Sequence, residues 1–178
     1  MAKGKKKNSN KAAMAVLKIG LFILVVLITA LVMSKYIVER VRVRNHSMEH
    51  TLENGDSVLI DKISYRFRDP KRFDIIVFKP KGSKEELIKR VIALPSETIQ
   101  ITDGRIYIDG EEIEDIDGLD PPGYAGIAAS PVTLSVGEYF VIGDNREESI
   151  DSRYEDVGLV TSTRITGRML MRLPRVIF

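Results

Sequence analysis

The 178-residue sequence contains no cysteine, no tryptophan and only two histidines. Without cysteine there can be no disulfide framework, no thiolate zinc site, no iron–sulfur cluster and no cysteine nucleophile. Two histidines leave little scope for an imidazole metal site, so we expect neither a metal nor a cofactor. The proportions of charged residues (29%) and hydrophobic residues (44%) are those of a globular chain. The length suits one domain of ordinary size with a short appendage.

The formal net charge of +2 is an average over two very different regions. Residues 1–44 carry ten basic residues against one acidic residue, Glu39, which gives +9. Residues 45–178 carry 17 basic residues against 24 acidic ones, which gives −7. The sequence therefore joins a basic N-terminal region to an acidic body.

The most apolar stretch of the chain lies at residues 12–34, where Lys18 is the only charged residue. About 20 mainly apolar residues cross a bilayer, and Lys18 is close enough to one end to extend its ammonium to the interface. We therefore predict a basic cytoplasmic stub (1–11), a transmembrane anchor (12–34) and an extracytoplasmic domain (35–178). A cleaved secretory signal is the alternative, but the run is long for one, and residues 29–34 offer no clean small-x-small cleavage site.

The orientation of the anchor follows from its flanking charges. Six lysines precede or enter the apolar run, and four basic residues follow it, so the positive-inside rule favours a cytoplasmic N-terminus. The lysines are not accompanied by aromatic residues or by a motif that fits a nucleic-acid groove. We therefore expect no nucleic-acid partner. The lipid bilayer is the expected partner of this region.

The sequence pattern after the anchor predicts β-strands. Short apolar runs rich in β-branched residues recur at 58–60, 75–78, 91–94, 139–142 and 165–173, and no long helical periodicity follows the anchor. Residues 98–110 contain two Asp-Gly pairs, the strongest short signal for tight hairpins. Residues 114–131 are acidic and rich in proline and glycine, which indicates a surface excursion. The predicted fold is mainly β, an antiparallel barrel or folded sheet on a membrane stalk.

Three segments hold polar residues that strands would not require: residues 45–52, 87–95 and 143–153. Each taken alone has an ordinary interpretation as a turn, a strand edge or a polar loop. Together with residues 72–78 they resemble the bacterial type I signal peptidases, in their short, Gram-positive-like form. The family's Ser-Met-x-Pro-Thr-Leu box is similar to residues 47–52 (Ser-Met-Glu-His-Thr-Leu). Its Gly-Asp-Asn-Arg-x-x-Ser-x-Asp-Ser-Arg box occurs without departure at residues 143–153.

Two further boxes support the resemblance. The family's Arg-Gly-Asp-Ile-Val-Val-Phe box resembles residues 72–78, and its Lys-Arg-Val-Ile-Gly-Leu-Pro-Gly-Asp box resembles residues 89–97. The departures are His50 for proline, Phe73 and Ala93 for glycine, and Ser96-Glu97 for Gly-Asp. None of them removes a group that performs chemistry.

Hydrolysis of an amide requires a nucleophile and a base that accepts its proton. His46 directly precedes Ser47 and would point to the opposite face of an extended chain, whereas His50 stays open as a minor possibility. We expect Ser47 and Lys89 to form the catalytic dyad, a known variant of the triad. Burial lowers the pKa of a lysine from its usual value of about 10.4, and the neighbours of Lys89 in sequence are apolar.

The resemblance implies roles for further residues. It implies that Ser149 orients the lysine amine, and that Asp151 and Arg153 form an ion pair that holds residues 143–153. The backbone amide of Ser47 would form part of the oxyanion hole, with Asn45 as a side-chain donor. The positions that match the family's shallow substrate pockets, for which plain core packing is the alternative, are Met48, Leu52, Leu87 and Ile88.

The implied activity is that of a membrane-bound serine endopeptidase without cofactor, which removes signal peptides from exported preproteins after small residues (Ala-x-Ala) through an acyl-enzyme. The secretion channel is a further partner that the resemblance leaves open. One competing enzyme is a self-cleaving Ser–Lys peptidase of the SOS-repressor class, but such chains are soluble and lack the 143–153 box. The signal peptidases of the endoplasmic reticulum carry histidine in place of the lysine. A non-enzymatic adaptor or inactive paralogue is disfavoured because Ser47 and Lys89 are both present.

Overall fold

The computed structural model describes the backbone of residues 3–174 and the side chains of residues 14–33 and 36–174. The chain divides into two compact units, Met1–Val38 and Glu39–Phe178. The first unit is helical, whereas the regular secondary structure of the second is mainly strand. The mainly β architecture with one N-terminal apolar helix, predicted from the sequence, is confirmed.

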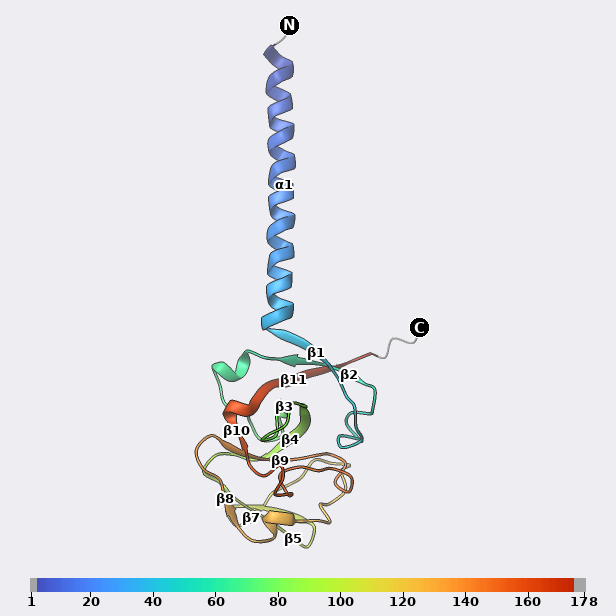
Figure 1. Ribbon diagram of the computed structural model, residues 1–178, viewed down its shortest axis with the longest axis vertical. Coiled ribbons are helices and arrows are strands. Elements are labelled where there is room, and N and C mark those ends of the chain that lie inside the picture. Colours follow the sequence, from blue (N-terminus) through green and yellow to red (C-terminus); the bar gives the residue numbers. More distant parts are fainter. Residues whose placement is uncertain (1–2, 175–178) are drawn as a thin grey trace. The chain divides into compact units, whose positions relative to one another are not determined.

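Helix α1 runs without interruption over Lys3–Tyr36 (Figure 1). Its apolar span, Met14–Met33, has 20 residues, and all of them are exposed. At 1.5 Å per residue, such a span covers about 30 Å, the thickness of the hydrocarbon core of a bilayer. The hydroxyl of Thr29 donates a hydrogen bond to the carbonyl of Val25 at 2.8 Å, so it needs no partner from outside the helix. The helix is long and apolar enough to cross a membrane.

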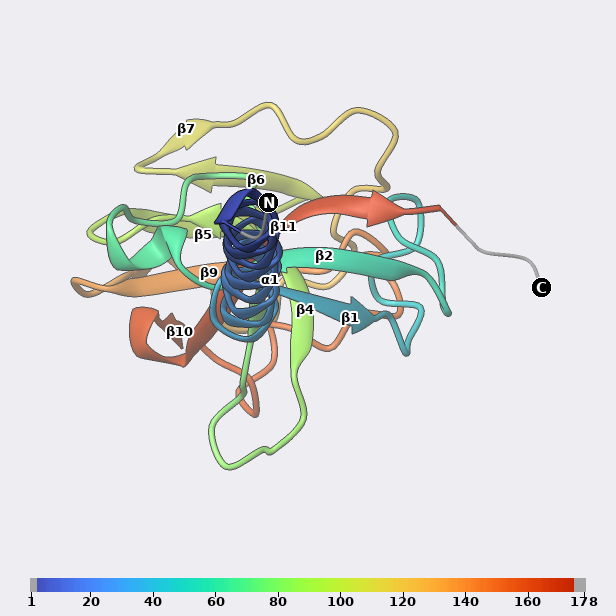
Figure 2. The same ribbon diagram turned by 90° about the horizontal axis from the view of Figure 1, so that it is seen from above.

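The larger sheet has seven strands in the order β1-β2-β11-β3-β4-β9-β10. The pairs from β2 through β10 are antiparallel. The register shifts within β11 and again between β4 and β9, and such bulges increase twist and bend the sheet (Figure 2). The strands are β1 (Val38–Arg42), β2 (Ser57–Asp61), β3 (Ile75–Phe78), β4 (Leu87–Ala93), β9 (Glu138–Ile142), β10 (Val160–Thr161) and β11 (Ile165–Leu173).

The smaller sheet has four strands in the order β7-β6-β5-β8. They are β5 (Thr98–Thr102), β6 (Arg105–Ile108), β7 (Glu111–Glu112) and β8 (Val132–Thr133). The two turns that join β5, β6 and β7 are Asp103-Gly104 and Asp109-Gly110, and all four residues have positive φ between 51° and 86°. Two-residue hairpin turns of type I′ require this conformation. The hairpins predicted from the Asp-Gly pairs are therefore confirmed.

Three short helical turns complete the second unit: η1 (Ser64–Arg66), η2 (Gly126–Ala129) and η3 (Ser162–Arg164). Turn η2 belongs to residues 114–131, for which we expect a surface excursion. This segment contacts residues 143–153 at three points. Asp115 pairs with Arg146 at 2.8 Å, and Arg153 accepts a hydrogen bond from Ile127 and donates one to the carbonyl of Tyr124. No sequence pattern indicated these contacts.

Three of the departures from the family boxes lie at positive φ. Phe73 (φ 68°) and Ser96 (φ 70°) stand where the boxes have glycine, the residue that adopts this conformation without steric penalty. His50 has φ 78°, whereas a proline would hold φ near −65°. The turn after Ser47 therefore has a backbone conformation that the family's proline could not adopt.

Candidate active site

Ser47 lies in a tight turn between β1 and β2. The turn is closed by backbone hydrogen bonds from Glu49 to His46 at 3.0 Å and from Leu52 to Met48 at 2.7 Å. Met48 and Leu52 are fully buried in a core cluster below the turn. Because these two side chains fill the core, the turn holds Ser47 in a nearly buried position, with 6% of its surface exposed.

Lys89 lies in the middle of β4 and is almost completely buried, with 1% of its surface exposed. The residue opposite Lys89 on the neighbouring strand β3 is the fully buried Ile76. Burial is the main reason why the pKa of Lys89 falls from 10.5 to about 8, and Arg153 lowers it further. Asp151 and Asp144 act in the opposite direction, but each is bound by an arginine. Among the described side chains, no carboxylate forms an ion pair with Lys89.

Gly143 is the point at which the serine turn, the end of β9 and residues 143–153 meet. A Cβ at this position would lie 2.3 Å from the carbonyl oxygen of Ser47 and 2.2 Å from Oγ of Ser149. The amide of Asn145 also donates a hydrogen bond to the Ser47 carbonyl at 3.2 Å. Gly143 directly follows β9, which pairs with the strand that carries Lys89. Only glycine permits this approach, because any side chain would collide with both serines.

Ser149 is buried, with 1% of its surface exposed. Its Oγ has no hydrogen-bond partner among the residues described. A buried hydroxyl without a partner is rare and usually has a functional reason. The hydroxyl is therefore free to bind an amine or a reacting group beside Ser47.

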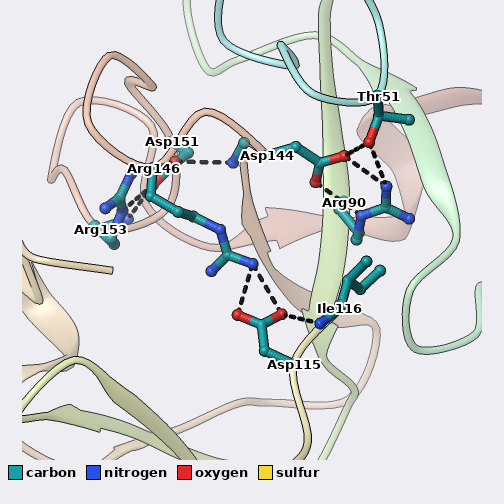
Figure 3. Close-up of polar contacts among 9 residues, drawn as sticks. Thr51, Arg90, Asp115, Ile116, Asp144, Arg146, Asp151 and Arg153 are labelled. Carbon is teal, nitrogen blue, oxygen red and sulfur yellow. Dashed lines mark hydrogen bonds and ion pairs between the residues drawn. The ribbon is translucent and has the colours of Figure 1, made fainter. Parts of the chain in front are cut away.

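Asp151 and Arg153 form a fully buried ion pair with two parallel contacts of 2.8 Å (Figure 3). Asp151 also accepts a hydrogen bond from the amide of Gly143 at 3.0 Å, and Arg153 donates to the carbonyl of Ser149 at 3.2 Å. The pair therefore fixes the backbone on both sides of the point where Ser47 and Ser149 approach each other.

A second buried ion pair, between Arg90 and Asp144, was not identified from the sequence. Arg90 binds both carboxylate oxygens of Asp144, at 2.8 and 2.5 Å, and donates to the carbonyl of Phe73 at 3.0 Å. The hydroxyl of Thr51 donates to the same carboxylate at 2.5 Å (Figure 3). The cluster ties the serine turn, β4 and the loop after β9 together. Its signal in the sequence was Arg90, which directly follows Lys89 and by strand alternation points to the opposite face.

Among the described residues, neither histidine side chain forms a hydrogen bond with Ser47. His46 is half-exposed and its Nδ1 interacts with Glu49, which raises the pKa of His46 chiefly through this hydrogen bond. His50 is also exposed and lies 3.8 Å from Asp120. The Oγ of Ser47 donates a hydrogen bond to Oδ1 of Asn45 at 2.8 Å.

A groove of about 740 Å³ runs beside Asn45, between β1 and the start of β4. β1 is the outermost strand of the larger sheet, and pairing of β4 with β9 begins only at Arg90. Two strand edges without a strand partner in the described structure therefore line the groove. Leu87 and Ile88 lie in its wall, whereas Met48 and Leu52 belong to the core and are not among the lining residues.

Comparison with known proteins identifies the family of the chain. The family model described as signal peptidase, peptidase S26, matches residues 16–173. The chain is 37% identical over 153 residues to signal peptidase I of Leptolyngbya laminosa, which covers 82% of this chain and 73% of the relative. It is 31% identical over 168 residues to signal peptidase I T of Bacillus subtilis, with coverage of 90% and 86%.

Among solved structures, a signal peptidase I from Enterococcus faecalis aligns with a TM-score of 0.48 and 31% identity, over 58% of this chain and 98% of the other. The match of the family model over most of the chain, and the two relatives above 30% identity, establish the family. This chain belongs to the signal peptidase family, peptidase S26, and is a serine endopeptidase.

Proposed function

We propose that this signal peptidase cuts exported preproteins with Ser47 as nucleophile and Lys89 as general base. The observation that carries the proposal is the burial of Lys89 without an ion pair in the described structure, which lowers its pKa to about 8. With such a pKa, about half of the lysine is neutral at pH 8 and can accept a proton. A lysine with its ordinary pKa would be almost wholly charged there.

The proposed reaction is acyl transfer. Ser47 Oγ attacks the carbonyl carbon of the residue before the cut, and Lys89 Nζ takes the hydroxyl proton. The lysine then gives this proton to the leaving amine, and an acyl-enzyme remains on Ser47. Lys89 then accepts a proton from water as the water oxygen attacks the ester carbonyl carbon. The lysine gives this proton to Ser47 Oγ, which releases the signal peptide with a free carboxylate and restores the serine.

The remaining residues of the site support this chemistry. The oxyanion would be bound by the Ser47 amide and by the side-chain amide of Asn45, which keeps two N–H donors while its Oδ1 accepts from Ser47. Ser149, whose buried hydroxyl has no described partner, would orient the amine of Lys89. Asp151 and Arg153 would hold this loop in register through their ion pair.

The substrate would lie extended in the groove and add to the free strand edges of β1 and β4, as peptides do when they extend a sheet. Leu87 and Ile88 would contact the small residues of an Ala-x-Ala motif, and Met48 and Leu52 would support the floor of these pockets from the core. Large side chains before the cut would then be excluded by shape.

The apolar helix would anchor the enzyme in the cell membrane with a cytoplasmic N-terminus and an extracytoplasmic catalytic unit. The length of its apolar span supports the anchor, and the excess of lysine on its leading side supports this orientation. Confinement to the membrane raises the effective concentration of enzyme near anchored preproteins without adding contacts. The secretion channel is a partner that this location would make accessible.

The dyad is tested by Ser47→Ala and Lys89→Ala in a preprotein cleavage assay with the full chain in detergent. Each change should lower kcat/KM by about a thousandfold or more, since members of a catalytic unit act together. Ser130→Ala and Lys81→Ala, two exposed residues, are matched controls that should keep the wild-type rate. Wild-type activity in either dyad variant would show that the assignment is wrong. The pH profile of kcat/KM should rise through about 8, and a limb near 10 would contradict the role of a desolvated lysine.

A further inference from the structure

Residues 114–131, which we call the bridging segment, contact both loops that form the candidate active site. Asp120 of the segment lies 3.8 Å from His50 in the serine turn. Asp115 binds Arg146 in the loop after β9 at 2.8 Å (Figure 3). The first pair is exposed and contributes little, whereas Arg146 is buried, so the strong contacts of the segment are those with the loop after β9.

Arg146 depends on the bridging segment for its counter-ion. It is buried, with 3% of its surface exposed, and its Nε and Nη1 have no hydrogen-bond partner among the described residues. Asp115 is the only carboxylate in the described structure that forms an ion pair with it, and a buried arginine stays charged and needs such a partner. Arg146 directly follows Asn145, whose amide binds the carbonyl of Ser47. The ion pair therefore acts one residue away from a contact with the nucleophile.

The bridging segment also holds Arg153, at the other end of the same loop. The amide of Ile127 donates a hydrogen bond to the carbonyl of Arg153 at 2.9 Å, and the Arg153 guanidinium donates to the carbonyl of Tyr124 at 3.2 Å. Between them, Gly126 has φ 57°, and a Cβ there would lie 2.0 Å from the Arg153 carbonyl oxygen. The same guanidinium binds the carbonyl of Ser149. A shift of the segment would therefore reach Ser149 through one residue.

The far side of the bridging segment is fixed on the smaller sheet. Ala128 is fully buried in the core cluster that contains residues of β5 and β6, and Ala125 and Ile127 pack against this cluster. Gln100 of β5 donates a hydrogen bond to the carbonyl of Ala129 at 3.4 Å. The segment therefore connects the core of the smaller sheet to the loop that carries Ser149.

We infer that the bridging segment holds this loop where Ser149 can orient the amine of Lys89, which makes Asp115 and Gly126 positioning residues for the reaction. The inference rests on the proposed function, in which Ser149 has that role. The groove is lined by residues 39–45, 79 and 84–88, so the segment does not contribute to its walls. Displacing the segment should therefore lower kcat and leave KM unchanged. A misplacement of about 1 Å in a catalytic arrangement can lower the rate about a hundredfold.

The ion pair is tested by Asp115→Asn in the preprotein cleavage assay with the full chain in detergent. The change keeps the shape of the side chain but leaves Arg146 without a counter-ion, and we expect kcat to fall about tenfold to a hundredfold with KM unchanged. Asp115→Glu retains the charge and should restore most of the rate. The matched control, Asp117→Asn, removes the same charge at an exposed position of the segment and should keep the wild-type kcat. Equal kcat in Asp115→Asn and Asp117→Asn would overturn the inference.

Two glycines of the segment provide a second test. Gly126→Ala places a methyl group against the Arg153 carbonyl, whereas Gly123→Ala places it where nothing lies within 4 Å. We expect kcat to fall about tenfold or more in Gly126→Ala and to stay at the wild-type value in Gly123→Ala. Thermal unfolding gives the folded fraction of each variant at the assay temperature, so that rates refer to folded enzyme. Equal kcat in the two alanine variants would contradict the positioning role of Gly126.

A double variant tests whether the segment acts through Ser149. Ser149→Ala should itself lower kcat, and adding Asp115→Asn should lower it by less than about twofold more, because residues that act through one another are not additive. Effects that multiply would overturn the inference. If Ser47→Ala is inactive while Asp115→Asn keeps the wild-type kcat, the inference alone fails. Wild-type activity in Ser47→Ala would instead show that the proposed function is wrong.

Discussion

Strand β4 carries two adjacent basic residues whose surroundings are opposite. Lys89 is buried against apolar neighbours without an ion pair in the described structure, and its pKa falls to about 8. Arg90 is also buried, with 8% of its surface exposed, but it binds both oxygens of Asp144 and a backbone carbonyl. A lysine can lose its proton when it is desolvated, whereas an arginine stays charged and needs a counter-ion. Of these two residues, Lys89 is therefore suited to the proposed proton transfer and Arg90 to structural support.

The largest effect on stability should come from removing the partner of the buried Asp144. Arg90→Met leaves the carboxylate without its counter-ion, and breaking such a pair lowers the free energy of unfolding by about 3–5 kcal/mol. Thermal or urea unfolding of the full chain in detergent measures the change. The matched control is Arg105→Met, which breaks an exposed pair with Glu112 and should alter stability by at most about 1 kcal/mol.

A double variant sharpens this result. Arg90→Met with Asp144→Leu removes both charges and should recover much of the lost stability, because apolar replacements of a buried pair are often tolerated. If Arg90→Met changes stability as little as Arg105→Met, the pair does not hold β4 to the loop after β9.

Lys89→Met should have the opposite effect on stability. The folded-state pKa of Lys89 is lowered from 10.5 to about 8, so folding disfavours its charged form. This destabilisation is fully present below about pH 8, where the lysine is charged in both states, and disappears as the pH rises to 10.5. The shift corresponds to roughly 3 kcal/mol. Lys89→Met should therefore be inactive at every pH, and its stability relative to the wild type should be greatest at pH 7 and should fall by roughly 3 kcal/mol as the pH rises to 10.5.

Unfolding free energies of both proteins between pH 7 and 10.5 measure this convergence. Arg105→Met serves as the control, since it leaves the surroundings of Lys89 unchanged and its difference from the wild type should follow no such curve. A constant gap between Lys89→Met and the wild type would show that Lys89 is not desolvated.

The smallest effect concerns the hydroxyl that joins the serine turn to the Arg90 cluster. Thr51→Val keeps the shape of the side chain but removes the hydrogen bond to Asp144, which should lower the free energy of unfolding by about 1–2 kcal/mol. Thr51→Ser retains the hydroxyl and should lie closer to the wild type. The same unfolding measurements apply, and equal stability of the valine and serine variants would contradict the role of the hydrogen bond.

Local features of the sequence were sufficient for several parts of the fold. The apolar span of α1 and the two Asp-Gly hairpins depend on consecutive residues, so a short window contains the information that determines them. The contacts of residues 114–131 with residues 143–153, in contrast, do not depend on consecutive residues. Asp115 and Arg146 are 31 residues apart, and neither residue type predicts which opposite charge it will meet.

The candidate site shows the same division. The sequence boxes alone identified Ser47, Lys89, Ser149, Asp151 and Arg153 as candidates, because the spacing within each box is local. Arg90 and Asp144 lie 54 residues apart, and Thr51 and Asp144 lie 93 apart, so the cluster they form was missed. The four residues expected to line the substrate pockets also lie in two different places. Leu87 and Ile88 line the groove, whereas Met48 and Leu52 fill the core.

The sequence by itself determined the apolar span, the strand pattern, the family and the residues proposed to perform the chemistry, because composition, periodicity and box spacing are properties of consecutive residues. Only the tertiary structure decided which of these residues are buried and what they meet. Lys89 is 1% exposed only in the folded chain, where Gly143 also lets the carbonyl of Ser47 approach Ser149. A pKa depends on the whole surroundings of a group, and those surroundings exist only in the folded chain.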